Sequence, residues 1–154
     1  MQKIVLASGN KGKLKELQQR LGHVADFVPQ SEFDIDTPEE TGQSFVENAL
    51  LKARYVSAKT GLPALADDSG LSVDYLDGAP GIYSARYAGP NAEDGDNNLK
   101  LLAELDQVSD DSRCAAFHCA LALLYPEPES SPIICAGIWR GKILTEPRGD
   151  NGFG

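Results

Sequence analysis

The feature that most constrains how this chain can fold is an alternation of strand-like and helix-like segments, which begins at its N-terminus. Residues 2–7 are strand-like, residues 11–21 carry leucines at helical spacing, and residues 24–28 are strand-like again. A strand, a helix and a strand in close succession are typical of a βαβ unit. The opening of the chain therefore predicts an α/β fold.

The clearest predicted helix covers residues 44–59. Ser44 and Glu47 have the spacing of a capping box, and apolar residues then recur on one face of the helix. Gly61 and Pro63 follow the last turn, as is common after a helix end. This segment should pack one face against the core.

The remaining segments continue the alternation. A long loop rich in glycine and proline is expected over residues 77–90, and a helix over residues 93–105. Further strands are predicted over residues 113–125, 133–139 and 142–146. Together these elements predict a mixed central sheet flanked by helices.

Length and charge limit the kind of protein this is. A chain of 154 residues with 42% hydrophobic content fits one globular domain over residues 1–154. A net charge of −9 argues against binding to a nucleic-acid polymer or a membrane surface, since both require basic faces. No apolar run approaches the length that spans a membrane, so we expect a cytoplasmic protein.

The chain has three cysteines, Cys114, Cys119 and Cys135, and all of them lie in apolar segments. An odd number in a domain of this size does not favour a disulfide framework. We expect reduced cysteines packed in the core.

The first chemical signal is the pair Asp67 and Asp68, followed by Ser69 and Gly70. A short apolar run ends at Ala66, so an acidic turn is expected to join strands over residues 62–66 and 71–76. Carboxylate oxygens suit Mg²⁺, which is usually held by one or two acids together with substrate phosphate. Adjacent carboxylates should also resist ionising together. The alternative is an ordinary turn, because these residue types favour turns.

The second signal is the turn SGNKGK at residues 8–13, between the first strand and the first helix. Free backbone N–H groups and the positive end of a helix dipole are suited to binding phosphate. The spacing matches neither the Walker A motif nor the pattern GxGxxG. A helix cap with solvated lysines is the alternative interpretation.

The third signal is the segment at residues 39–53, where Glu39 and Glu40 precede a helix that places Asn48 and Lys52 one turn apart. The acids could simply complement the helix dipole, and Lys52 could be a surface lysine. Taken with the other two signals, however, these residues favour a metal-assisted phosphate site.

Five segments together resemble the Ham1/RdgB-type inosine triphosphate pyrophosphatases, and they extend along essentially the whole chain. The segments are SGNKGK (8–13), EETGQSFVENALLKA (39–53), ADDSGLSVDYLDGAPGIYSARYAGP (66–90), RCAAFHC (113–119) and GDNGFG (149–154). The resemblance implies hydrolysis of non-standard purine nucleoside triphosphates, such as ITP, dITP and XTP, to the monophosphate and pyrophosphate. It also implies two lobes with the nucleotide between them, and a homodimer.

The resemblance also implies roles for individual residues. Glu40 and Asp68 would hold Mg²⁺, Asp68 would be the catalytic acid-base residue, and Asp67 would support it. Phe153 would stack near the base. The implied substrate-binding residues are Ser8, Gly9, Asn10, Lys11, Gly12, Lys13, Lys52, Ser69, Phe153 and Gly154.

The sequence departs from the family pattern at its end. Family members continue after GFG with an aromatic residue and an aspartate, then a lysine and a Ser-His-Arg motif, whereas this sequence stops at Gly154. We therefore expect one domain that lacks the family's C-terminal segment. Two alternatives remain: a Maf-like nucleotide pyrophosphatase with another base preference, and a non-catalytic nucleotide-binding module.

Overall fold

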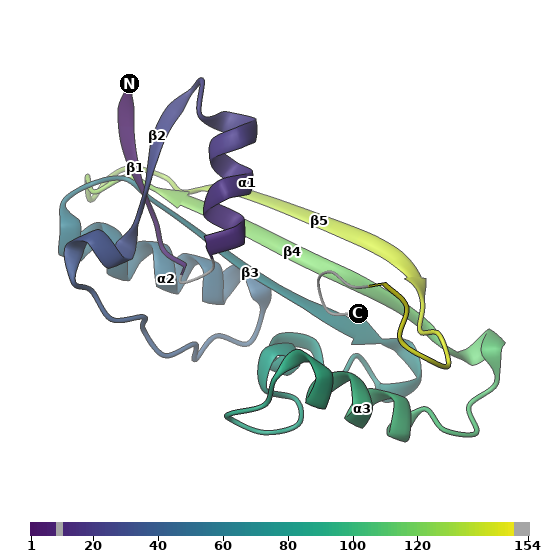
Figure 1. Ribbon diagram of the computed structural model, residues 1–154. Helices are drawn as coiled ribbons and strands as arrows, with labels where there is room; N and C mark the ends of the chain where they lie inside the picture. The colour runs from purple at the N-terminus through teal and green to yellow at the C-terminus, as the bar shows by residue number, and fades with distance from the viewer. Residues whose placement is uncertain (9–10, 150–154) are drawn as a thin grey trace. The chain divides into compact units, whose positions relative to one another are not determined.

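The structure is a computed structural model that describes residues 1–8 and 11–149. The described residues form a five-stranded sheet with the order β2-β1-β3-β4-β5 (Figure 1). Strand β1 pairs in parallel with both β2 and β3, and Figure 1 shows β4 running opposite to β3 and β5. The predicted α/β fold with a mixed sheet is confirmed. The strands are β1 (Gln2–Leu6), β2 (Ala25–Pro29), β3 (Ala64–Val73), β4 (Cys114–Leu124) and β5 (Ile133–Lys142).

The described α-helices are α1 (Lys11–Leu21), α2 (Phe45–Thr60) and α3 (Asp94–Glu104). Helix α2 begins as predicted, because the Ser44 hydroxyl accepts the N–H of Glu47 at 3.1 Å. It ends at Gly61, whose φ of +65° is the left-handed conformation that glycine adopts without strain. No helix in the described ranges is both long and apolar enough to cross a membrane.

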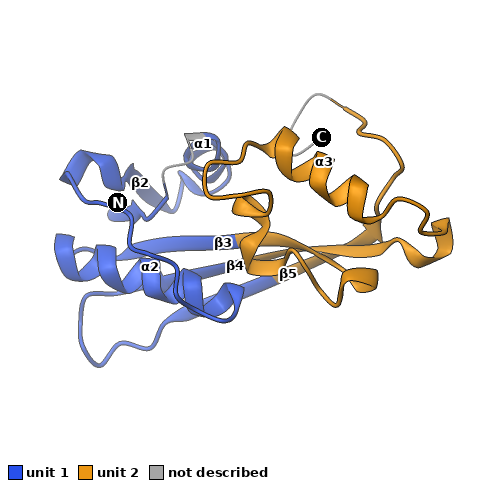
Figure 2. Ribbon diagram, turned by 90° about the horizontal axis from the view of Figure 1, so that it is seen from below, with its two compact units in different colours: residues 1–68, 120–136 blue, residues 69–119, 137–154 orange. Residues whose placement is uncertain are grey.

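The chain divides into two compact units (Figure 2). Unit 1 contains residues 1–68 and 120–136, and unit 2 contains residues 69–119 and 137–154. Strands β3, β4 and β5 contribute residues to both units. The predicted nucleotide cleft between two lobes stays a prediction.

Unit 1 has an apolar layer on each face of its strands, and Figure 2 shows α1 and α2 on opposite sides of them. On the α2 side, Ala64 and Ala66 of β3 pack with Ala49, Ala53 and Val56 of the helix. On the α1 side, Leu65 of the same strand belongs to the cluster that contacts the helix leucines. This alternation follows from the two-residue period of a strand and assigns each face of β3 to one helix.

Unit 2 packs Val73, Leu101, Leu105 and Ala115 into its own apolar cluster. The buried guanidinium of Arg113 lies beside this cluster and forms hydrogen bonds to three main-chain carbonyls. It donates from Nη1 to the Leu105 carbonyl at 2.7 Å, and from Nε and Nη2 to the carbonyls of Ile143 and Leu144, both at 2.8 Å. Arg113 thereby joins the end of α3 to the segment that follows β5.

Three sequence predictions about local structure are wrong. Residues 67–70 form no turn, because β3 is one continuous strand over Ala64–Val73. The strand predicted over 142–146 is absent from the described residues, since β5 ends at Lys142. The segment predicted as a loop over 77–90 contains a 3₁₀ helix at Gly81–Arg86.

The three cysteines are free, as predicted, but they are exposed rather than buried. Cys135 lies on β5, the last strand of the sheet, where every residue is exposed. Cys114 and Cys119 occupy exposed positions of the neighbouring strand β4. Apolar sequence context predicts a strand here, but it does not reveal which face of that strand is covered.

Candidate functional site

Asp68 is a buried carboxylate in unit 1 that has two polar partners on helix α2. It is the fifth residue of β3 and is 8% exposed. Its Oδ2 accepts a hydrogen bond from Asn48 Nδ2 at 3.1 Å, and its Oδ1 lies 3.9 Å from Lys52 Nζ. Both partners are on α2, four residues apart and therefore on one face of the helix. The apolar face of α2 thus brings an amide and an ammonium group to the carboxylate.

Lys52 also binds a second carboxylate. Its Nζ donates to Glu40 Oε1 at 2.6 Å, and the lysine is 8% exposed. Glu40 lies in the segment before α2, so acids from two separate parts of unit 1 share one ammonium group. Burying these charges is tolerable only because they are paired.

The two carboxylates fit a hard divalent cation. No group of three or more His, Cys, Asp or Glu side chains within residues 1–8 and 11–149 is placed to hold a metal. Glu40 and Asp68 offer two oxygen donor groups, and Mg²⁺ is usually held by one or two carboxylates, with its other ligands from water and phosphate. The donor chemistry excludes a thiolate-type or imidazole-type site at this position.

Asp67 belongs to the other face of β3. It is 6% exposed and forms an ion pair with Lys13, in the first turn of α1. Because successive residues of a strand point to opposite faces, Asp67 and Asp68 do not face one another. The expectation that they act as a coupled carboxylate pair is therefore corrected. The supporting role of Asp67 stays a prediction.

The remaining site residues are placed only in part. Ser8 follows β1 and is half-buried, Gly12 and Lys13 lie in the first turn of α1, and Ser69 follows Asp68 on β3. The other predicted substrate-binding positions lie outside the described residues or, for Lys11, have no described side chain: Gly9, Asn10, Lys11, Phe153 and Gly154.

Sequence reasoning noted the position of Asn48 but assigned it no role. Asn48 is fully buried, and its Oδ1 accepts the Gly42 N–H at 2.8 Å while its Nδ2 reaches Asp68. The signal in the sequence was an amide directly beside Ala49, at a helix position that points into an apolar core. Such a residue requires polar partners.

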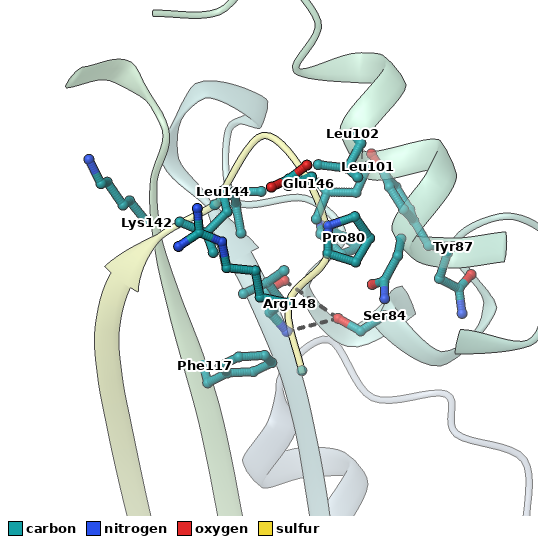
Figure 3. Close-up of a pocket in the computed structure, with 16 residues that line it drawn as sticks. Pro80, Ser84, Tyr87, Leu101, Leu102, Phe117, Lys142, Leu144, Glu146 and Arg148 are labelled. Atoms are coloured by element: carbon teal, nitrogen blue, oxygen red, sulfur yellow. Dashed lines mark hydrogen bonds between the residues drawn. The ribbon is translucent and has the colours of Figure 1, made fainter. Parts of the chain in front are cut away.

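Unit 2 contains a separate cavity of about 230 Å³ (Figure 3). Leu101 and Leu102 of α3 form one wall, Phe117 of β4 lies opposite, and Arg148 comes from the segment after β5. The hydroxyl of Ser84 accepts the Leu71 N–H at 2.9 Å and ties the 3₁₀ helix Gly81–Arg86 to β3. The cavity is mostly apolar and was not predicted from the sequence.

Comparison with known proteins supports one family. The model of the Ham1 family matches residues 4–154. A protein of Vibrio cholerae named dITP/XTP pyrophosphatase is 57% identical over 155 aligned residues, which cover 100% of this chain and 78% of that protein.

Solved structures agree with this match. A HAM1 protein from Coxiella burnetii superimposes with a TM-score of 0.92 at 52% identity, covering 100% of this chain and 79% of that one. The Staphylococcus aureus Ham1 protein gives a TM-score of 0.87 at 39% identity, covering 99% of this chain and 78% of that one. With sequence and fold in agreement over the whole chain, this protein belongs to the Ham1 family.

Proposed function

We propose that this protein is a metal-dependent nucleoside triphosphate pyrophosphatase that hydrolyses dITP, XTP and ITP to the monophosphate and pyrophosphate. The observation that carries the proposal is the arrangement in unit 1, where Glu40 and Asp68 share the ammonium group of Lys52. A relative 57% identical to this chain is named dITP/XTP pyrophosphatase, which supports the same substrate class here.

Glu40 and Asp68 are the residues that would hold the metal, and Mg²⁺ is the ion that their oxygen donors suit. When bound, such an ion neutralises charge on the triphosphate oxygens and lowers the pKa of a bound water. Lys52 is buried beside both acids. When a metal takes its place there, its ammonium group can pair with a phosphate group of the substrate instead.

The residues of the chain itself bind and orient the substrate. Lys13 and Lys52 stabilise negative charge on the triphosphate, together with the N-terminal end of α1. Asp68 takes the proton of the attacking water. A free aspartate has a pKa of about 3.9, so it is ionised near neutral pH, as a group that takes up a proton must be.

The other predicted residues complete the proposal. Ser8 and the turn over residues 9–12 would bind phosphate oxygens, Ser69 would contact the substrate, and Phe153 and Gly154 would lie against the base. Attack at the α-phosphorus accounts for release of pyrophosphate. We further propose a cytoplasmic homodimer.

A substrate panel with a pyrophosphate assay tests the proposal. Purified protein with Mg²⁺ is expected to release pyrophosphate from dITP, ITP and XTP much faster than from ATP, dUTP or TTP. ATP carries a 6-amino group where ITP carries a 6-oxo group, so a site that donates a hydrogen bond at this position rejects ATP. Preference for dUTP or TTP would favour the Maf-like alternative. Nucleotide-dependent thermal stabilisation without any product would favour a binding module.

A further inference from the structure

We infer that Asn48 is a positioning residue that couples the Glu40 segment to Asp68 and so sets the spacing of the two proposed metal ligands. The inference rests on the proposed function, because it concerns the same pair of carboxylates. Asn48 is 0% exposed, and each end of its amide has a partner from a different part of unit 1. Nδ2 donates to Asp68 on β3, and Oδ1 accepts from Gly42 in the segment before α2.

The orientation of this amide is fixed by the chemistry of its two neighbours. An ionised carboxylate only accepts hydrogen bonds, so the NH₂ group must face Asp68. A backbone N–H only donates, so the oxygen must face Gly42. Turning the amide by 180° would place two acceptors together at 3.1 Å and two donors together at 2.8 Å. Asn48 can therefore join these groups in one way only.

Asparagine at position 48 is expected to stabilise the helix and its packing less than an apolar residue would. Its neighbours on the buried face of α2 are Ala49, Ala53 and Val56, which are all 0% exposed. Asparagine is also a weaker helix former than alanine or leucine in a helix interior. An apolar residue here would pack without needing partners, so the contacts to Gly42 and Asp68 are what the amide contributes.

Gly42 is pressed against the same amide. A Cβ atom added at Gly42 would lie 2.6 Å from Asn48 Oδ1 and 2.8 Å from the Cβ of Glu47. The backbone before α2 therefore approaches the helix more closely than any side chain permits. Glu40 is two residues from this contact, so the position of its carboxylate depends on the approach that Asn48 and Gly42 share.

One amide thus holds both acids, Asp68 directly and Glu40 through Gly42. Mg²⁺ requires nearly ideal octahedral geometry, so its affinity depends on how well the carboxylates are held in place. Changes to the groups that orient metal ligands typically cost about 10-fold to 100-fold in metal affinity or activity. We expect Asn48→Ala to show a loss of this size in both quantities, with a smaller effect on the KM for dITP.

Ser57→Ala is the matched control. Ser57 is also on α2 and is 1% exposed, but its hydroxyl donates to the Leu62 carbonyl at 2.9 Å, at the other end of the helix. Removal of either side chain creates a small cavity and breaks hydrogen bonds, two at Asn48 and one at Ser57. A purely structural role therefore predicts a loss of thermal stability in both variants, larger for Asn48→Ala, and unchanged Mg²⁺ binding in both.

The test measures Mg²⁺ binding by calorimetry without nucleotide, and kcat and KM for dITP with Mg²⁺. Asn48→Ala should weaken Mg²⁺ binding about 10-fold or more and lower kcat, while Ser57→Ala stays within about twofold of the parent. Gly42→Ala breaks the second contact and should weaken Mg²⁺ binding in the same direction. It also carries the test if Asn48→Ala does not fold.

Folded variants at Asn48 or Gly42 that bind Mg²⁺ as the parent does would overturn the inference. Failure of the proposed function is a separate result, since it appears in the parent as an absence of pyrophosphate release from dITP, ITP and XTP. In that case the calorimetric comparison of Asn48→Ala with Ser57→Ala still decides whether the amide holds a cation site.

Discussion

Each compact unit buries a cation, and the partners of the two cations differ. Lys52 in unit 1 is 8% exposed and contacts the carboxylates of Glu40 and Asp68. Arg113 in unit 2 is 3% exposed, and its described contacts are with three main-chain carbonyls. Carbonyl partners are neutral and fixed in the backbone, so Arg113 serves as a structural tie. Carboxylate partners can exchange the lysine for a metal ion, so we propose that Lys52 belongs to the metal and phosphate site.

Substitution of Arg113 should give the largest effect. Arg113→Met would remove three hydrogen bonds from a charged donor to the carbonyls of Leu105, Ile143 and Leu144, and each hydrogen bond to a charged group contributes about 1.5 to 3 kcal/mol. We expect the free energy of unfolding to fall by about 3 kcal/mol or more, measured by urea denaturation. Arg140→Met on the exposed strand β5 is the control and should change stability little. Equal free energies of unfolding for the two variants would contradict a structural role of Arg113.

Asp68→Asn should give the next largest effect, on activity rather than on stability. The substitution preserves side-chain size but removes a metal-binding charge and the proposed base. We expect kcat to fall by about 10² or more, which corresponds to about 2.7 kcal/mol of transition-state stabilisation. Asp67→Asn, on the opposite face of β3, should lose less. Near-normal turnover by Asp68→Asn in a steady-state pyrophosphate assay would contradict the assignment.

Lys52→Met tests whether Lys52 differs from a purely structural cation such as Arg113. It should raise the affinity for Mg²⁺ and lower kcat/KM for dITP. The ammonium group competes with Mg²⁺ for Glu40 and Asp68, so its removal should tighten Mg²⁺ binding in the absence of nucleotide. The same change should lower kcat/KM for dITP by roughly tenfold or more, since a phosphate contact is lost. Lys13→Met, on the other face of β3, should lower kcat/KM without tightening Mg²⁺ binding.

Calorimetry and steady-state kinetics on the two lysine variants measure these effects. If Lys52→Met binds Mg²⁺ no better than Lys13→Met does, the ammonium group does not compete with the metal at these acids. If kcat/KM is unchanged for dITP, Lys52 does not contact the substrate.

Local patterns in the sequence predicted the parts of the fold that depend on neighbouring residues. The cap of α2 at Ser44 and its end at Gly61 follow from side chains within four residues of each terminus. The βαβ opening follows from short-range periodicity. These features need no information about distant parts of the chain.

The acidic segment of β3 could not be predicted in the same way. Turn propensity favoured a break at Asp67 and Asp68, but the strand continues and both carboxylates, themselves buried, find polar partners. Asp67 is 54 residues from Lys13, and Asp68 is 20 residues from Asn48. Propensity contains no information on contacts of this range, so it predicted a turn where the strand continues. The role of the two acids as site residues stays a prediction.

The smallest expected effect concerns Tyr87 in unit 2, whose hydroxyl donates a hydrogen bond to Glu104 close to the surface. Burial raises the pKa of Tyr87 to about 12 from the usual 10.0, with added contributions from the hydrogen bond to Glu104 and from its charge. The folded state therefore favours the neutral phenol. Its stabilising contribution is fully present below pH 10 and is lost as the pH rises through about 12.

Glu104→Gln should lower the pKa of Tyr87 toward 10.0, because it removes the charge that opposes formation of the phenolate. An ultraviolet absorbance titration of the phenolate, with Tyr87→Phe to identify its contribution among the five tyrosines, measures the shift. Stability near neutral pH should change by less than about 1 kcal/mol, since the pair is largely solvated. An unchanged titration in Glu104→Gln would mean that burial alone raises the pKa of Tyr87. The contact between Tyr87 and Glu104 would then contribute less to holding α3 in place than the hydrogen bond from Arg113 to Leu105 does.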